Sequence, residues 1–193
     1  MAEYVKISTI GIRPKRMEAG RDWGNAVKET IKYLQEEIDQ VLPDKPDMIV
    51  LPECCDMPLY CRDKDYIKVR GNKVLDFLCN IARENSCNLA YSAIREAEDG
   101  AMRNSTQIIN RNGKVIGAYN KNHLTIDEIE ERGILCGKDA PIIECDFGRV
   151  GCAICFDLNF DKLRLKYVKS RPDLIIFSSV YHGGLMQNYW AYS

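Results

Sequence analysis

Two short runs of apolar residues with no polar interruption constrain the fold of this chain most strongly. Met48-Ile49-Val50-Leu51 is closed by Pro52, and Leu174-Ile175-Ile176-Phe177 follows Pro172. Runs of this length and composition are typical of strands that are covered on both faces, as parallel strands are when helices enclose them. The sequence therefore points to a layered α/β protein.

The first half of the chain alternates strands with helices. Residues 4–12 alternate apolar and polar side chains, as a half-buried strand does. Asp22 can cap a long helix whose apolar residues recur every three or four positions. Asn72 can begin a second helix that leads to a strand at residues 89–94. Together with the run at Met48, these segments predict the order β-α-β-α-β.

Two hairpins are expected next. Residues 106–110 and 115–119 flank the turn sequence Asn112-Gly113, which is a strong hairpin signal. Residues 141–145 and 149–154 form a second such pair. The sheets are therefore expected to be mixed.

The last forty residues return to alternating helices and strands. Asp157 can cap a third helix, the apolar run after Pro172 supplies a strand, and the chain ends inside a helix that begins near Gly184. The sequence contains no internal repeat and no composition typical of a linker. Residues 1–193 are therefore predicted to form one domain.

Composition limits the class of partner. The chain has 27 basic and 28 acidic residues, so it lacks the charge excess that would attract nucleic acid or an anionic membrane. We expect a small-molecule partner, no nucleic acid and no membrane. The N-terminus does not resemble a signal peptide, and no apolar run approaches the length of a membrane span. A cytoplasmic location is expected.

The nine cysteines are many for a chain of this length. Their odd number and the lack of an export signal favour reduced thiols over a disulfide framework. Cys152 and Cys155 form a C-x-x-C pair, which leaves a metal or dithiol site as an alternative. Against it, residues three apart in a strand point to opposite faces, and no second pair completes a tetrahedral site. The simpler interpretation of His123 and His182 is that they are hydrogen-bonded structural groups rather than metal ligands.

Three reactive side chains each come directly after an expected strand. They are Glu53 in Val50-Leu51-Pro52-Glu53, Lys121 in Tyr119-Asn120-Lys121, and Cys155 in Gly151-Cys152-Ala153-Ile154-Cys155. Strand ends are where α/β folds usually present catalytic groups. Taken singly, each could be an ordinary loop carboxylate, surface cation or buried thiol. Their joint order and the residues that flank them decide between these interpretations and a catalytic set.

These three motifs, in this order, resemble the Glu, Lys and Cys motifs of the nitrilase superfamily of carbon–nitrogen hydrolases. Two flanking stretches extend the resemblance, 146–151 before the cysteine and 157–160 after it. The resemblance implies a four-layer α-β-β-α sandwich and hydrolysis of a small amide or N-carbamoyl compound, or less favourably a nitrile. A cysteine thioester would be the intermediate, and neither a cofactor nor a metal would be needed.

Each residue then has an expected role. Cys155 needs a base, which Glu53 can supply, and a neighbouring cation such as Lys121 would favour its thiolate. Lys121 and the backbone amide of Phe156 are the candidates to stabilise the oxyanion. A second carboxylate that orients Lys121 is expected at Glu130, seven residues before Gly137.

The resemblance also implies homodimers or larger homo-oligomers, paired through the helix after Asp157 and the segment 185–189. Relatives continue well beyond Ser193, so the domain is expected to be incomplete at its C-terminal end. This leaves a second function open, in which the chain is a catalytically impaired relative that serves as an assembly or binding partner. The substrate is not predicted, because the loops expected to form its pocket, 56–65 and 180–185, carry no charge pattern that identifies a ligand.

Overall fold

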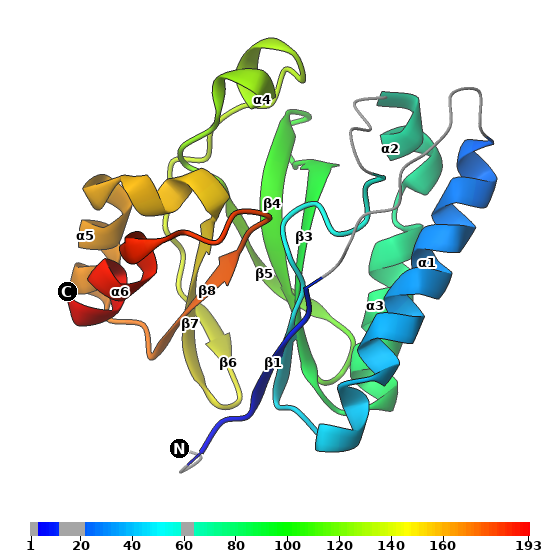
Figure 1. Ribbon diagram of the computed structural model, residues 1–193, viewed down its shortest axis with the longest axis horizontal. Helices are drawn as coiled ribbons and strands as arrows, with labels where there is room; N and C mark the ends of the chain where they lie inside the picture. The colour runs from blue at the N-terminus through cyan, green and yellow to red at the C-terminus, as the bar shows by residue number, and fades with distance from the viewer. Residues whose placement is uncertain (1–3, 12–21, 59–63) are drawn as a thin grey trace.

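The computed structural model describes residues 4–11, 22–58 and 64–193 of the chain. Their helices and strands form four layers, in the order helix, sheet, sheet, helix (Figure 1). One sheet has its strands in the order β1 (Ile7–Thr9), β2 (Met48–Val50), β3 (Asn88–Glu96), β4 (Met102–Ile109) and β5 (Val115–Asn120). The other has the order β6 (Ile143–Cys145), β7 (Gly148–Ile154) and β8 (Leu174–Ser178). The predicted layered α/β architecture with mixed sheets is confirmed.

Helices cover the outer face of each sheet. The five-stranded sheet is flanked by α1 (Trp23–Asp39), α2 (Lys64–Arg70) and α3 (Lys73–Glu84), and the three-stranded sheet by α5 (Asp161–Ser170) and α6 (Leu185–Tyr192) (Figure 1). A short helix, α4 (Ile126–Glu130), lies at one end of the sandwich, and two 3-10 helices, η1 (Leu42–Asp44) and η2 (Cys155–Asn159), complete the set. No helix in the described part of the chain is both long and apolar enough to cross a membrane.

Strand directions follow from the connections between strands. β1, β2 and β3 are parallel because helical segments join them, whereas β3, β4 and β5 are antiparallel neighbours joined by tight turns. The β4–β5 turn uses the predicted Asn-Gly pair: Gly113 has φ 71°, and its amide donates to the Asn110 carbonyl oxygen over 2.8 Å. A Cβ on Gly113 would lie 2.4 Å from the carbonyl oxygen of Cys79, so this turn requires glycine.

Two apolar cores lie on opposite faces of the five-stranded sheet. Leu89, Tyr91 and Ala93 of β3 pack with α1 and α3 in the first core, whereas Ala90 belongs to the second core, between the two sheets. On β4, Ile109 belongs to the first core and Ile108 to the second. This alternation is the period of two that a strand imposes on its side chains.

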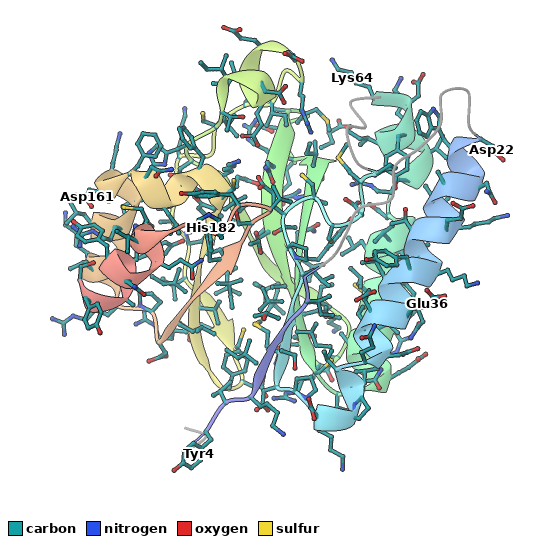
Figure 2. The ribbon with its side chains drawn as sticks, in the orientation of Figure 1. Tyr4, Asp22, Glu36, Lys64, Asp161 and His182 are labelled. Atoms are coloured by element: carbon teal, nitrogen blue, oxygen red, sulfur yellow. The ribbon has the colours of Figure 1, made fainter. Side chains whose placement is uncertain are left out.

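Helix α1 begins as predicted. The side chain of Asp22 accepts a hydrogen bond from the Gly24 amide over 2.8 Å, which satisfies one of the free N–H groups of the first turn. Figure 2 shows Asp22 at the start of this helix and Glu36 on its outer surface. The inward-facing residues Ala26, Val27, Leu34 and Ile38 are buried.

Several elements differ from the sequence expectations. Within the described residues the first strand covers only Ile7–Thr9, β4 begins four residues earlier than expected at Met102, and α2 and α4 were not predicted. The residue before α5 is Phe160, so Asp157 does not cap that helix. Asn72 precedes α3 without a side-chain hydrogen bond to it. α2 and α4 escaped prediction because helices of seven and five residues carry too few apolar positions to show a period.

Candidate active site

The strand ends bring Glu53, Lys121 and Cys155 to one edge of the sandwich. Glu53 follows β2, Lys121 follows β5 and Cys155 follows β7. β5 runs parallel to β2, because two antiparallel pairings separate it from β3 and β3 is parallel to β2. The carboxyl ends of all three strands lie near one end of the molecule, close to α4 (Figure 1).

A buried ion cluster forms there. Lys121 Nζ lies 2.8 Å from Glu53 Oε1 and 2.8 Å from Glu128 Oε2. Glu53 is 6% exposed, Glu128 7% and Lys121 2%, so water screens these contacts little. Burial alone would lower the pKa of Lys121, but the attraction of the two carboxylates outweighs it and raises that pKa. Lys121 is therefore a cation at any physiological pH.

The second carboxylate of this cluster is Glu128, not Glu130. Glu130 is exposed, whereas Glu128 also accepts a hydrogen bond from the Thr125 amide over 2.9 Å. Thr125 and Glu128 form a capping box at the start of α4, and this geometry turns Glu128 back toward Lys121. Two residues further on, the helix has rotated by about 200° and carries Glu130 away from the cluster. The pattern Thr-x-x-Glu is the signal in the sequence that could have pointed to Glu128.

Asn104 links the two carboxylates and was not predicted. Its Nδ2 donates to Glu53 Oε1 over 2.8 Å and to Glu128 Oε1 over 2.7 Å. Its backbone carbonyl oxygen accepts from the Lys121 amide over 2.8 Å. Asn104 therefore fixes the spacing of the cluster through both its side chain and its backbone. An asparagine within a strand carries no local sequence signal for this role.

Cys155 is the first residue after β7 and is half-buried. It has φ 45°, a left-handed conformation that side chains other than glycine seldom adopt. Non-glycine residues in this region cluster at functional sites, where the surrounding structure holds them. The turn lifts the thiol out of the sheet at the point where the 3-10 helix η2 begins.

The charge around the Cys155 thiol differs from the sequence expectation. Burial and the negative charge of Glu53 raise the pKa of Cys155 to about 11, and Lys121 offsets this only in part. Burial is the largest cause of this shift, and the charge of Glu53 raises the pKa by more than the charge of Lys121 lowers it. Cys155 rests as a neutral thiol at neutral pH, and a hydrogen bond with Glu53 contributes to that state.

Phe156 is the second residue of η2. The first N–H groups of a helix have no intrahelical acceptor, so the Phe156 amide belongs to the group that can bind an oxyanion beside the thiol. The Phe156 side chain is exposed and meets the Phe160 ring edge to face, with centroids 5.2 Å apart.

Asp157 clamps the lysine loop to the cysteine turn. Its Oδ2 accepts from Tyr119 Oη over 2.7 Å and from the Ile154 amide over 3.0 Å, and its Oδ1 accepts from the His123 amide over 2.9 Å. The Asp157 side chain is fully buried. The imidazole of His123 also lies 3.0 Å from Asp157 and stacks on Phe160. This clamp holds the backbone on either side of Lys121 in register with the backbone around Cys155.

The remaining sequence candidates lie apart from this cluster. Cys152 is completely buried in the core between the sheets, and burial raises the pKa of its thiol. His182 accepts from the Gly184 amide over 3.0 Å. Within residues 4–11, 22–58 and 64–193, no three His, Cys, Asp or Glu side chains are grouped as a metal site would require. Of the two expected pocket loops, the first lies partly outside the described residues, at positions 59–63.

Two curated proteins illustrate what this chain is similar to in sequence. The chain is 22% identical over 185 residues to the deaminated glutathione amidase of Dictyostelium discoideum, covering 86% of this chain and 63% of that protein. It is 26% identical over 162 residues to omega-amidase NIT3 of Saccharomyces cerevisiae, covering 75% of this chain and 55% of that protein. The chain thus spans between half and two thirds of the length of these relatives.

Solved structures share the fold. The crystal structure of Saccharomyces cerevisiae Nit3, a member of the nitrilase superfamily, matches with a TM-score of 0.73 at 20% identity, over 97% of this chain and 71% of that chain. An amidase from Nesterenkonia sp. matches with a TM-score of 0.79 at 13% identity, over 97% of this chain and 71% of that chain. The model of the carbon-nitrogen hydrolase family matches residues 7–193. This chain therefore belongs to the carbon-nitrogen hydrolase family, within the nitrilase superfamily.

Proposed function

We propose that this protein hydrolyses a non-peptide carbon–nitrogen bond of a small amide or N-carbamoyl compound through a cysteine thioester. The observation that carries the proposal is the buried Glu53–Lys121–Glu128 cluster beside a thiol held in a left-handed turn. These residues supply a base, a fixed cation and a nucleophile within one site. A nitrile remains the less favoured substrate.

In the first half-reaction, Glu53 takes the proton of the Cys155 thiol as sulfur bonds to the carbonyl carbon. Because the thiol is neutral at rest, this proton transfer must accompany attack, and Glu53 is the carboxylate that interacts with it. The carbonyl oxygen becomes an oxyanion, which the Lys121 ammonium and the Phe156 amide stabilise. Collapse of this intermediate breaks the carbon–nitrogen bond, and the proton on Glu53 passes to the departing amine.

In the second half-reaction, Glu53 takes a proton from water as the water attacks the thioester. The carbon–sulfur bond then breaks, the thiol regains a proton, and a carboxylic acid leaves. Glu128 and Asn104 hold Lys121 and Glu53 in place through both steps, by the contacts already described. They act on the reaction through the groups that they orient.

Relatives support the thiol as nucleophile and an amide as substrate. One solved structure of a Nesterenkonia amidase variant carries the acetamide moiety of fluoroacetamide added at the active-site cysteine. A relative named omega-amidase supports placing small amides in the first substrate panel. The match covers 55% of the length of that relative, so the activity of this chain is to be tested directly.

We further propose that the protein pairs with copies of itself and acts in the cytoplasm. Exposed apolar side chains on α5 and α6 support pairing: Leu165, Val168, Leu185 and Tyr189. The eight cysteines in the described part of the chain are free thiols, which suits a reducing compartment. Light scattering at high concentration that finds only a monomer would refute the pairing.

The test of function is ammonia release from monoamides of dicarboxylic acids, N-carbamoyl amino acids and nitriles. We expect turnover in the first or second class, loss of turnover in Cys155→Ala, and a covalent adduct of acyl mass on Cys155 when the reaction is quenched early. If the folded protein releases no ammonia and forms no adduct with any class, the proposal is wrong, and the alternative role as an assembly partner is favoured.

A further inference from the structure

A cavity of about 550 Å³ lies on the helix side of the five-stranded sheet, beneath α2 and α3. Its apolar wall includes Met57, Ile67, Leu75, Ala93 and Met102. The cavity is within the size range of small-molecule sites, which are mostly apolar with a few polar groups that orient the ligand. Lys64, which also lines it, stands at the start of α2 (Figure 2).

The sheet separates this cavity from the candidate active site. Asn104 of β4 donates to Glu53. It lies an even number of residues from Ile108, on the strand face that packs between the sheets. Gln107 lines the cavity. It lies two residues from Ile109, on the strand face that packs against the helices. Side chains of opposite parity on one strand point to opposite faces. Glu53, Lys121 and Cys155 are not among the described residues that line the cavity.

Gln107 is a polar residue of the lining that can meet a ligand. Its side chain is only 8% exposed, yet its amide has no hydrogen-bond partner among the described residues. The hydroxyl of Tyr91, its partner across the β3–β4 ladder, donates instead to Asp56 over 2.6 Å. Because Gln107 lines the cavity, its amide is available to a ligand with a matching donor and acceptor.

Most of the cations around the cavity are already neutralised. Arg70 is paired with Asp56 at 2.5 Å, Lys68 with Asp65 at 3.2 Å, and Arg132 with Asp127 at 3.0 Å. Lys64 and Arg95 have no carboxylate partner among the described residues, and Glu96 is the one acidic residue in the described lining. The lining therefore keeps an unbalanced positive charge.

Arg95 is the better placed of these two cations. It stands directly opposite Arg103 across the ladder, where like charges repel, and Arg103 is already paired with Asp99 at 2.6 Å. The hydrogen bonds of Arg95 are long, 3.3 Å to the Glu96 carbonyl oxygen and 3.5 Å to Asn120 Oδ1. Burial is the main cause of the lowered pKa of Arg95, so an anion at this position would relieve an unfavourable charge.

We propose that this cavity binds a small carboxylate with an aromatic or aliphatic body and a hydroxyl or N–H group at its far end. The carboxylate pairs with Arg95, the body fills the apolar wall, and the far polar group bonds to the Gln107 amide. Tyr91, the ladder partner of Gln107, lies four residues from Arg95, or about 13 Å along the strand before side-chain reach is subtracted. The two polar ends of the ligand must therefore be separated by an apolar spacer.

The probe is 3-(4-hydroxyphenyl)propionate, which has the required groups and contains no carbon–nitrogen bond to hydrolyse. Binding to the purified protein is followed by calorimetry and by the side-chain amide signals of Gln107 in NMR spectra. We expect saturable binding that shifts those signals. Two matched controls, 3-phenylpropionate without the hydroxyl and 4-(3-hydroxypropyl)phenol without the carboxylate, are each expected to bind about fivefold or more weakly.

Variants then locate the site. Gln107→Leu, which keeps the volume and removes the unpartnered amide, is expected to fold with undiminished stability and to bind the probe about fivefold more weakly. Arg95→Gln is expected to weaken binding about tenfold. Cys155→Ala should bind the probe as the unaltered protein does, which separates this site from the proposed catalytic one. Binding that Cys155→Ala abolishes, or a probe that leaves the Gln107 signals unmoved at saturation, would overturn the proposal, as would the absence of binding.

Discussion

Replacing Glu128 by glutamine tests the geometry of the active site most directly, because Glu130 provides a matched control two residues away. Glu128 accepts from Lys121 Nζ over 2.8 Å, from Asn104 Nδ2 over 2.7 Å and from the Thr125 amide over 2.9 Å. Glutamine keeps one acceptor oxygen, but its NH2 group would face a donor. The variant therefore loses the charge and about one charge-assisted hydrogen bond, worth roughly 1.5–3 kcal/mol.

If that bond serves to hold Lys121 in its catalytic position, the whole loss is felt in the transition state. At 1.36 kcal/mol for each tenfold change in rate, Glu128→Gln should lower kcat about 10- to 150-fold. Glu130 is exposed, so Glu130→Gln should change kcat less than about twofold and the free energy of unfolding by less than about 0.5 kcal/mol. Ammonia release under saturating substrate measures both.

The pH dependence gives an independent readout. Burial opposes ionisation of Glu128, but Lys121 and Asn104 outweigh it and lower the pKa of this carboxyl below the ordinary value of 4.5. A lowered pKa in the folded protein means that the ionised group adds stability above pH 4.5 and loses it as the pH falls below that value. The stability deficit of Glu128→Gln should thus be constant near neutral pH and shrink in acid. The reasoning is refuted if Glu130→Gln loses activity while Glu128→Gln retains it.

Three further predictions concern the other residues of the site. Lys121→Ala should lower turnover at least about 100-fold, the scale for one lost oxyanion donor. Lys121→Arg should be similarly impaired, because a planar guanidinium does not replace a compact ammonium. A folded Lys121→Ala protein with normal turnover would remove this residue from the mechanism. Glu53→Gln should abolish turnover, because the proposed base is lost. The same variant should speed alkylation of Cys155 by iodoacetamide at mildly alkaline pH, measured by peptide mapping of the label, because the charge of Glu53 raises the pKa of Cys155. Slower labelling than in the unaltered protein would contradict the charge argument. Asp157→Ala leaves the Tyr119 hydroxyl and the Ile154 and His123 amides without this acceptor. The free energy of unfolding, measured by urea titration, should fall by about 3 kcal/mol. A loss below about 1 kcal/mol would show that the clamp is not needed for folding.

Local sequence determined most of the framework of this protein. The uninterrupted apolar run at Met48, the Asn112-Gly113 turn and the Asp22 cap each act through neighbours a few residues away, and each is found where it was predicted. Glu53, Lys121 and Cys155 were proposed from motifs at strand ends whose order and flanking residues resemble those of a known family, and these are also local features of the sequence. The structure brings Lys121 onto Glu53, with the Cys155 thiol beside them.

Only the tertiary structure decided the features of the site that depend on contacts between residues far apart in the sequence. Asn104 enters the cluster because antiparallel pairing of β3 with β4 places it opposite Ile94, near the end of the strand. Glu128 rather than Glu130 joins the cluster because the fold places Lys121 beside the first turn of α4, within 2.8 Å of Glu128. The thiol of Cys155 rests neutral because it is buried beside Glu53, and both its burial and the charges near it depend on three-dimensional neighbours rather than on position along the chain.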